Sequence, residues 1–275
     1  MLGAIIGDVV GSVYEWHNIK TKYFTLFKDR CFFTDDTVMT IATASALIKT
    51  PEYASDEEIR KNFIREMKYY GRKYPNSGYG GMFGRWIFSD DTAPYNSFGN
   101  GSAMRVSPCA FCAKTLNEAL RLAKLNAEIT HSHPDGIRGA QATAAAIFLA
   151  RAGRNKREIK NYIENNFYTL NKTLDEIRPD YKFDETCRGT VPPALTAFFE
   201  SESFEDAVRN AISLGGDSDT LAAITGSVAW AYYDRRRDDL REYESEIKKY
   251  LPDEFINIID SFLSADSQSL YTAVL

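Results

Sequence analysis

Apolar side chains recur every three or four residues along most of the chain, which is the spacing of one face of an α-helix. Between positions 56 and 70, for example, Ile59, Phe63, Ile64 and Met67 share one helical face. Strand-like alternation is scarce, so the pattern predicts an all-α protein. The expected helices cover residues 36–49, 56–70, 102–114, 117–129, 135–152, 156–167, 204–213, 218–234, 238–250 and 253–263.

Two longer connections interrupt this helical pattern. Residues 71–101 are rich in glycine and aromatic side chains, and long connections of this kind often carry function. Residues 170–190 are polar, and Pro192 and Pro193 after them fit the first turn of a further helix. No linker divides the sequence, so we expect one compact multi-helix domain over residues 1–275.

Small residues near the N-terminus predict a close contact between helices. Gly3, Gly7 and Gly11 recur at intervals of about one helical turn within an apolar run that Asp8 interrupts. Asp8 and Glu15 are about two turns apart and would share one face of a continuous helix. An unpaired buried Asp8 would cost several kcal/mol, so it is either a solvated or capping acid or part of a polar centre.

Composition and charge exclude several classes of function. A net charge of −5 and a pI near 5.4 argue against a nucleic-acid backbone as the main partner. No stretch approaches the ~20 apolar residues that span a bilayer, and the N-terminus lacks the basic region of a secretory signal. The four cysteines fit reduced thiols, with Cys109 and Cys112 in the core, so we expect a cytoplasmic protein.

Two short acidic runs, Thr34-Asp35-Asp36-Thr37 and Asp217-Ser218-Asp219-Thr220, each open a helix of small residues. Either run alone is most simply an N-cap, because its oxygens accept the exposed amides of the first turn. Both runs hold more carboxylates than a cap needs, which favours one polar centre built from distant segments. Two carboxylates ~5 Å apart repel by roughly 3 kcal/mol at an effective dielectric of about 20, so a proton or a cation must lie between them. Oxygen ligands favour Mg²⁺, Mn²⁺ or Ca²⁺.

Such a cluster could share two metal ions that polarise an oxygen and orient a water. Glu15, just past the apolar N-terminal run, is a further candidate ligand or water-orienting group. Two other families with acidic motifs fit less well. Helical isoprenoid synthases need an Asp three residues after their first acidic pair, where this chain has Met39. Haloacid-type phosphatases carry their Asp-x-Asp motif after a parallel strand, whereas Asp217 follows a predicted helix and a Gly-Gly break.

A glycine-rich segment, residues 97–105, opens another helix. Backbone amides at such a start can hold phosphate and Phe98 could stack on a base, although ordinary turns share this composition. The segment lacks the Lys-Ser/Thr ending of a P-loop. Two of the three histidines, His131 and His133, lie just before the alanine-rich helix, where a structural role and a ligand contact are both open. Zinc is not expected, because no cysteine or further histidine lies nearby.

Taken together and in this order, the motifs resemble the ADP-ribosylglycohydrolase family, which includes the dinitrogenase-reductase-activating glycohydrolase and the J1 crystallins. The motifs span residues 3 to about 230. They are Gly7-Asp8 with Glu15, Thr34-Asp35-Asp36-Thr37, Gly99-Asn100-Gly101-Ser102-Ala103-Met104-Arg105, Thr130-His131 and Gly215-Gly216-Asp217-Ser218-Asp219-Thr220.

The resemblance implies an all-α fold with two Mg²⁺ or Mn²⁺ ions in a cleft. It implies hydrolysis of ADP-ribose from a modified protein or a small conjugate, with water attacking ribose C1″ and ADP-ribose as the product. The implied metal ligands are Thr34, Asp35, Asp36, Asp217, Asp219 and Thr220. The implied catalytic acids are Glu15, Asp35 and Asp36. The implied substrate contacts are Ser97, Phe98, Gly99, Asn100, Gly101, Ser102 and His131.

The chain departs from the nitrogenase-regulating branch, in which an Asp lies just before the Gly-Asn-Gly segment. The nearest acids here, Asp90 and Asp91, are too distant to take that role. The acceptor, arginine, serine or another group, therefore stays open, as does the identity of the base. Because the crystallins keep the fold for another use, the alternative is a catalytically silent ADP-ribose- or nucleotide-binding protein, or a structural one. Release of free ADP-ribose would separate these hypotheses.

Overall fold

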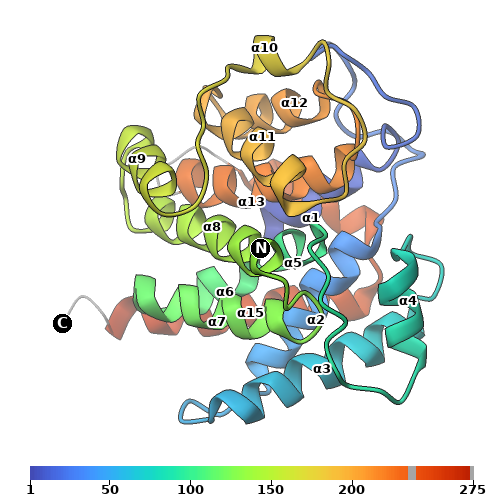
Figure 1. The fold of residues 1–275 in the computed structure, drawn as a ribbon, viewed down its shortest axis with the longest axis vertical. Coiled ribbons are helices and arrows are strands. Elements are labelled where there is room, and N and C mark those ends of the chain that lie inside the picture. Colours follow the sequence, from blue (N-terminus) through green and yellow to red (C-terminus); the bar gives the residue numbers. More distant parts are fainter. Residues whose placement is uncertain (235–239, 273–275) are drawn as a thin grey trace.

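The computed structural model describes residues 1–234 and 240–272, which form helices joined by loops, without a β-strand (Figure 1). The all-α prediction is therefore confirmed. An isolated antiparallel bridge joins Gly99 to Thr186. None of the described helices combines the length and the apolar character that a membrane span requires. The helices are α1 (Leu2–Gly11), α2 (Asp35–Ile48), α3 (Asp56–Lys73), α4 (Gly81–Phe88), α5 (Gly101–Met104), α6 (Ser107–Cys112), α7 (Leu116–Glu128), α8 (Pro134–Arg151), α9 (Lys156–Asn166), α10 (Leu174–Ile177), α11 (Cys187–Phe199), α12 (Phe204–Ile212), α13 (Ser218–Asp234), α14 (Arg241–Ile247), the 3₁₀ helix η1 (Lys248–Tyr250) and α15 (Asp253–Thr272).

Helices α1 and α13 cross closely in the middle of the molecule, and every residue of α1 is buried. A Cβ atom on Gly7 would lie 2.0 Å from the Ala222 carbonyl oxygen, and one on Gly3 would lie 2.1 Å from the Gly226 carbonyl oxygen. Any larger residue would push the two backbones apart, so the glycine series sets the crossing distance. This contact brings Asp8 of α1 to the start of α13.

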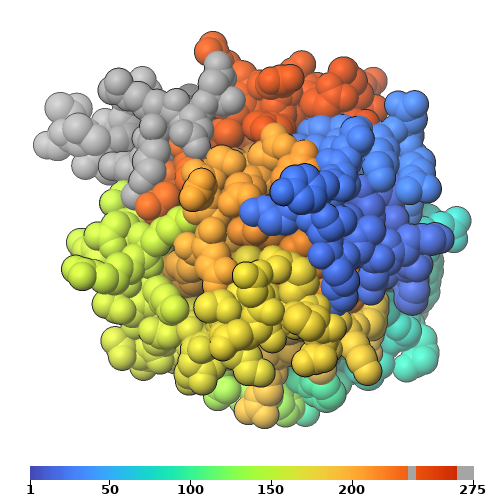
Figure 2. Space-filling model, turned by 90° about the horizontal axis from the view of Figure 1, so that it is seen from above, coloured from blue at the N-terminus to red at the C-terminus, as the bar shows by residue number. Residues whose placement is uncertain are grey.

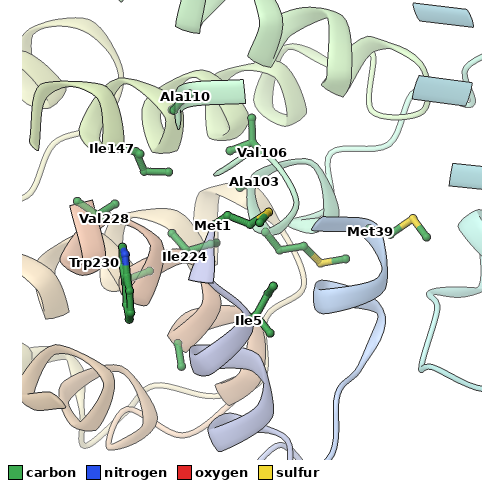
Figure 3. Close-up of a cluster of buried hydrophobic side chains, with 14 of the residues drawn as sticks. Met1, Ile5, Met39, Ala103, Val106, Ala110, Ile147, Ile224, Val228 and Trp230 are labelled. Atoms are coloured by element: carbon green, nitrogen blue, oxygen red, sulfur yellow. The ribbon is translucent and has the colours of Figure 1, made fainter. Parts of the chain in front are cut away.

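The hydrophobic core surrounds this helix pair. Met1, the residue before α1, and Ile5 of α1 lie beside Ile224, Val228 and Trp230 of α13, and all five are buried (Figure 3). Side chains from α2, α6 and α8 complete the cluster. Toward one end of the molecule lie α10, α11 and α12, and toward the other lie α3 and α7 (Figure 1). The polar ends of α2 and α13 are thereby held on a rigid, fully packed centre.

Most predicted helices are present within one or two residues of their expected ends, and α13 has the predicted bounds. The helix expected over 102–114 is instead two short helices, α5 and α6. Pro108 lies in the first turn of α6, where its missing N–H is tolerated, but it cannot continue a helix from α5. The helix expected over 238–250 corresponds to α14 and η1, and its first two positions lie outside the described residues.

The connection expected over 71–101 contains one helix, α4, that the sequence analysis did not predict because the segment is rich in glycine. Phe83, Trp86 and Ile87 of α4 are spaced three and four apart and are buried on one face. Lys68 of α3 fixes the end of α4, because its ammonium group donates to the carbonyl oxygens of Trp86 and Ser89. The connection is therefore an ordered part of the molecule.

The expectation that Pro192 and Pro193 begin a helix is wrong. Helix α11 begins at Cys187, after the Thr186 N-cap, and both prolines lie inside it. Pro193 has no N–H for the carbonyl of Gly189, and that carbonyl instead accepts a hydrogen bond of 3.0 Å from the Tyr181 hydroxyl. A side chain from the preceding loop thus replaces the lost helical bond.

Candidate metal centre and active site

Carboxylates from four segments meet at the N-terminal ends of α2 and α13. Oxygen atoms of Asp8, Asp36 and Asp219 lie within 4.8 Å of one another, and so do oxygen atoms of Glu15, Asp217 and Asp219. Asp219 belongs to both groups. The structure thus brings the two acidic runs together as two adjacent oxygen clusters that share one carboxylate.

Asp8 ties α1 to the start of α2. Its carboxylate accepts hydrogen bonds from the backbone N–H groups of Thr34 and Thr37, both at 3.0 Å, and from the Thr34 hydroxyl at 2.7 Å. Complete burial raises the pKa of Asp8, and these hydrogen bonds act in the opposite direction. Asp8 is therefore not a solvated acid: it accepts amides at the start of α2, as a capping acid does, and it also belongs to the polar centre.

One carboxylate oxygen of Asp36 lies in the cluster without a hydrogen-bond donor from the described residues. Its Oδ2 accepts a hydrogen bond of 3.1 Å from the Thr220 hydroxyl, whereas its buried Oδ1 has no hydrogen-bond partner among the described residues. A buried carboxylate oxygen without a partner is costly, and a divalent cation would satisfy it. The surrounding donors are carboxylate and hydroxyl oxygens, which suit Mg²⁺ or Mn²⁺. The residues present therefore fit a metal site.

Asp217 joins this centre to the glycine-rich segment. Asn100 donates through its side-chain amide to Asp217 Oδ2 at 2.6 Å and to the Thr190 hydroxyl at 3.1 Å. Gly215 and Gly216 both have φ near +69°, a left-handed conformation that favours glycine and turns the chain sharply before α13. The turn therefore presents the Asp217 carboxylate to the cluster.

Glu15 reaches the cluster by a route that the sequence did not indicate. Helix α1 ends at Gly11, so the expected helical face shared by Asp8 and Glu15 is wrong. A turn closed by the 2.8 Å bond from the Tyr14 N–H to the Gly11 carbonyl carries Glu15 back toward α13. Burial, and then the charges of Asp217 and Asp8, raise the pKa of Glu15 to about 7.

The loop of residues 12–34 that carries Glu15 is fastened to the neighbouring loop of residues 178–186. Trp16 stacks on Phe183, with ring centroids 5.5 Å apart, and the Trp16 side chain is a polar neighbour of Glu15 that acts against the rise in the pKa of Glu15. The Asn18 side chain exchanges two hydrogen bonds with the Gly216 backbone, at 2.8 and 3.0 Å. Figure 2 shows the blue loop beside the yellow segment that precedes α11. Glu15 is therefore held from two sides.

The electrostatics of the cluster favour a bound cation. Asp35, at the first position of α2, is half-buried, and burial followed by the charges of Asp8 and Asp217 raises the pKa of its carboxyl well above the usual range. Burial and neighbouring carboxylates do the same for Asp36 and Asp219. In the absence of a cation, protons must therefore neutralise part of the cluster at neutral pH. A divalent cation would replace those protons.

The predicted substrate segment lies beside this cluster and is held by backbone hydrogen bonds. The Ser97 N–H donates to the Thr130 carbonyl, the Asn100 N–H to the Glu185 carbonyl, and Phe98 accepts through its carbonyl from the Cys187 N–H. The Phe98 ring is half-exposed, with its edge against His133 at 5.5 Å between centroids. The exposed part of the Phe98 ring thus offers an aromatic surface next to the predicted substrate segment.

The remaining members of the predicted substrate set have different surroundings. Ser102 is buried and its hydroxyl donates to the Gly136 carbonyl of α8 at 2.7 Å. His131 is buried beside Gly99 and Gly101, whereas His133 accepts the Asp135 N–H as the N-cap of α8. The two histidines therefore differ in role, which their spacing did not reveal.

A separate cavity of about 870 Å³ is lined by residues 20–24 together with residues of α10 and α12. It contains none of the clustered carboxylates. Its cations already have partners, because Lys22, Arg178 and Arg209 pair with nearby acids, and Lys20 donates to the Tyr181 carbonyl. Size alone therefore does not identify the chemical centre of this molecule.

Comparisons with known proteins agree with this geometry. The family model described as ADP-ribosylglycohydrolase matches residues 1–254. ADP-ribosylhydrolase ARH3 of Homo sapiens is 26% identical over 309 residues, covering 85% of this chain and 84% of that protein. ADP-ribosylarginine hydrolase Tri1 of Pseudomonas putida (strain GB-1) is 26% identical over 263 residues, covering 85% of this chain and 69% of that protein. A solved ADP-ribosylglycohydrolase-related protein complex has the same fold, with a TM-score of 0.65, 22% identity and coverage of 96% and 97%.

Proposed function

Because this chain belongs to the ADP-ribosylglycohydrolase family, we propose that it uses two divalent cations to hydrolyse the bond between ribose C1″ and the acceptor. Family membership makes the protein an ADP-ribosylglycohydrolase, a hydrolase that removes ADP-ribose. The observation that supports it most is Asp219, whose carboxylate is shared by two clusters of close oxygen atoms.

The two carboxylate groups would each hold one Mg²⁺ or Mn²⁺ ion. Asp8, Asp36 and Asp219 form the first group, and Glu15, Asp217 and Asp219 form the second. When bound, the cations supply positive charge that polarises the ribose hydroxyls and orients water. The resemblance assigns three further ligands outside these two groups, Thr34, Asp35 and Thr220. The Thr34 hydroxyl donates to Asp8 and the Thr220 hydroxyl to Asp36, which supports their assignment.

Glu15 is suited to take the proton of the attacking water. Burial and the neighbouring carboxylates raise its pKa to about 7 in the metal-free protein, and bound cations would lower that pKa and keep Glu15 ionised as a base. As the water oxygen bonds to C1″, the bond from C1″ to the acceptor breaks, and the water proton passes to Glu15. The proton then leaves with the acceptor oxygen or nitrogen. The charges of Asp8 and Asp217 act on both Asp35 and Asp36, so these two carboxylates lie near the cluster and would stabilise positive charge on the ribose ring.

The segment from Ser97 to Ser102 would bind the remainder of the ADP-ribosyl group. Asn100 connects it directly to Asp217, so the cluster and the segment form one continuous surface. The half-exposed Phe98 ring offers a flat apolar face for adenine, and His131 lies behind the glycines where a diphosphate would pass. The product would be free ADP-ribose, and the partner an ADP-ribosylated protein or a small ADP-ribosyl conjugate.

Hydrolysis of defined conjugates tests this function. The protein, stripped with a chelator, is incubated with ADP-ribosyl-serine and ADP-ribosyl-arginine peptides, with and without Mg²⁺ or Mn²⁺, and free ADP-ribose is quantified. We expect release from at least one peptide that requires the cation. Tight binding of ADP-ribose without release from either peptide would overturn the proposal and favour a silent binding protein.

A further inference from the structure

A chain of buried polar side chains connects α2, which carries Asp36, to His131. The Thr43 hydroxyl of α2 accepts a hydrogen bond of 3.1 Å from the Asn126 side-chain amide of α7. Asn126 in turn accepts from Arg105 through its side-chain oxygen at 3.0 Å and through its carbonyl at 2.9 Å. All these side chains are buried, so each hydrogen bond is protected from water.

Arg105 is a buried cation without a salt bridge among the described residues. It is 1% exposed, lies at the end of α5 just after the predicted substrate segment, and its guanidinium packs 5.6 Å from the Phe83 ring. Burial lowers the pKa of Arg105 to about 10, which still leaves the side chain charged at neutral pH. A charge retained at such a cost indicates a role that a neutral residue would not perform.

The hydrogen-bond donors around Thr130 determine the form of His131. Arg105 can only donate, so the Thr130 hydroxyl accepts its bond of 2.8 Å. Among the described residues, the one other hydrogen-bond partner of the Thr130 hydroxyl is His131 Nδ1. The single proton of the Thr130 hydroxyl is then directed at His131 Nδ1, which is 2.8 Å away. Nδ1 therefore accepts, and a neutral ring must carry its proton on Nε2.

The protonated nitrogen faces the glycine-rich segment. His131 Nε2 lies 3.1 Å from the position that a Cβ atom would take on Gly101 and 3.5 Å from that on Gly99. Side chains at those two positions would cover the imidazole edge, and glycine leaves it open. Burial and then the charge of Arg105 hold the pKa of His131 well below its usual range, so the ring stays neutral.

We propose that Arg105 and Thr130 are positioning residues that fix His131 as the Nε2–H tautomer, so that it donates a hydrogen bond to the diphosphate of the substrate. This inference rests on the proposed function for the identity of the anion. The tautomer itself depends only on contacts within the protein. Arg105 would act through Thr130 and would also add positive potential near the anion without touching it.

Nitrogen NMR of the histidine side chains tests the tautomer directly. The chain contains three histidines, so their ring signals in ¹⁵N-labelled protein can be assigned by substituting each in turn. We expect His131 Nδ1 to show the shift of an unprotonated ring nitrogen and Nε2 that of a protonated one. The opposite pattern in the wild-type protein would overturn the proposal, whatever the enzyme hydrolyses.

Two substitutions of Thr130 separate positioning from a simple structural role. Thr130→Val keeps the shape and removes the hydroxyl, and we expect mixed His131 tautomers and about 10-fold weaker ADP-ribose binding. Thr130→Ser keeps the hydroxyl and should restore both the wild-type spectrum and the affinity. Equal spectra and affinities for both variants would contradict the proposal.

The wild-type measurements distinguish this proposal from the proposed function. If the wild-type protein shows the expected tautomer but does not bind ADP-ribose, the proposed function fails and the diphosphate is the wrong acceptor. If it binds ADP-ribose with His131 in the other tautomer, the proposed function survives and this inference fails. Should Thr130→Val not fold, the wild-type spectrum still decides the tautomer.

Discussion

The hydroxyl of Thr220 donates a hydrogen bond of 3.1 Å to Asp36 Oδ2, although 184 positions separate the two residues. This contact joins the starts of α2 and α13. Each helix start would be an ordinary N-cap if it lay at the surface. Because they face each other inside the molecule, their excess carboxylates become a cluster that requires compensating positive charge.

Replacing Asp36 with Asn should remove activity while leaving the fold intact. Asparagine keeps the size of the side chain but loses the charge that would hold a cation, so cation-dependent ADP-ribose release should fall by at least about 100-fold. The exposed Asp175→Asn variant, which changes the net charge equally, should keep wild-type turnover. Turnover by Asp36→Asn within a few-fold of the control would contradict the assignment.

Gly7→Ala should destabilise the whole molecule. The added methyl group would lie 2.0 Å from the Ala222 carbonyl oxygen, so α1 and α13 must separate, at a cost of about 3 kcal/mol. Gly81→Ala is the matched control, because no heavy atom lies within 4 Å of its Cβ position and its free energy of unfolding should change by about 0.5 kcal/mol or less. Urea unfolding measures both, and similar values for the two variants would refute the close-packing argument.

Trp16→Phe should slow catalysis without weakening substrate binding. Phenylalanine can still stack on Phe183, but it lacks the indole N–H, so Glu15 loses the polar neighbour that acts against the rise in its pKa. We expect kcat to fall about 3- to 10-fold with KM nearly unchanged. Tyr53→Phe, which removes a polar atom from a fully exposed ring, is the control. An increase in KM alone would show that Trp16 binds substrate instead.

The stability of the metal-free protein should fall as pH rises. Carboxyl groups whose pKa is raised by folding contribute stability below their unfolded pKa, near 4, and that contribution is lost as pH rises through the folded values. For Glu15 the folded value is about 7, and for Asp36 and Asp219 it is also raised. The unfolding midpoint should therefore decrease between pH 5 and pH 8 in the presence of a chelator.

Adding Mg²⁺ or Mn²⁺ should reverse this trend, because the cation replaces the protons that the cluster otherwise needs. The rise in unfolding midpoint caused by the cation should be larger at pH 8 than at pH 5. Differential scanning fluorimetry at both pH values measures it. A cation effect that is independent of pH would mean that the ion binds elsewhere.

The fold class and the helices that begin at the two acidic runs could be predicted from the sequence, because both depend on local pattern. Helical periodicity marks α13 from Ser218 to Asp234, and excess carboxylates mark its start. The sequence alone did not assign Asp8 to the candidate metal centre, because an Asp in an apolar run has several interpretations. The Gly7-Asp8 pair was the available signal, because a glycine contact carries the neighbouring acid to the partner helix.

Other parts of the site could not be predicted because they depend on contacts between distant loops. The approach of Glu15 to Asp217 requires the turn after Gly11, and nothing in the local pattern specifies that turn. The role of Arg105 depends on Asn126 and Thr130, which reach it only in the folded protein. A charged residue within a predicted helix gives no local sign that it will be buried.

Anomalous X-ray diffraction at the manganese edge, from crystals grown with Mn²⁺, tests the central claim most directly. The account predicts two adjacent anomalous peaks among the carboxylates, one near Asp8 and Asp36 and one near Glu15 and Asp217, with Asp219 between them. Asp219→Asn crystals should lose or weaken both peaks. Wild-type crystals with no anomalous peak within this cluster, at a Mn²⁺ concentration that supports hydrolysis, would contradict the account.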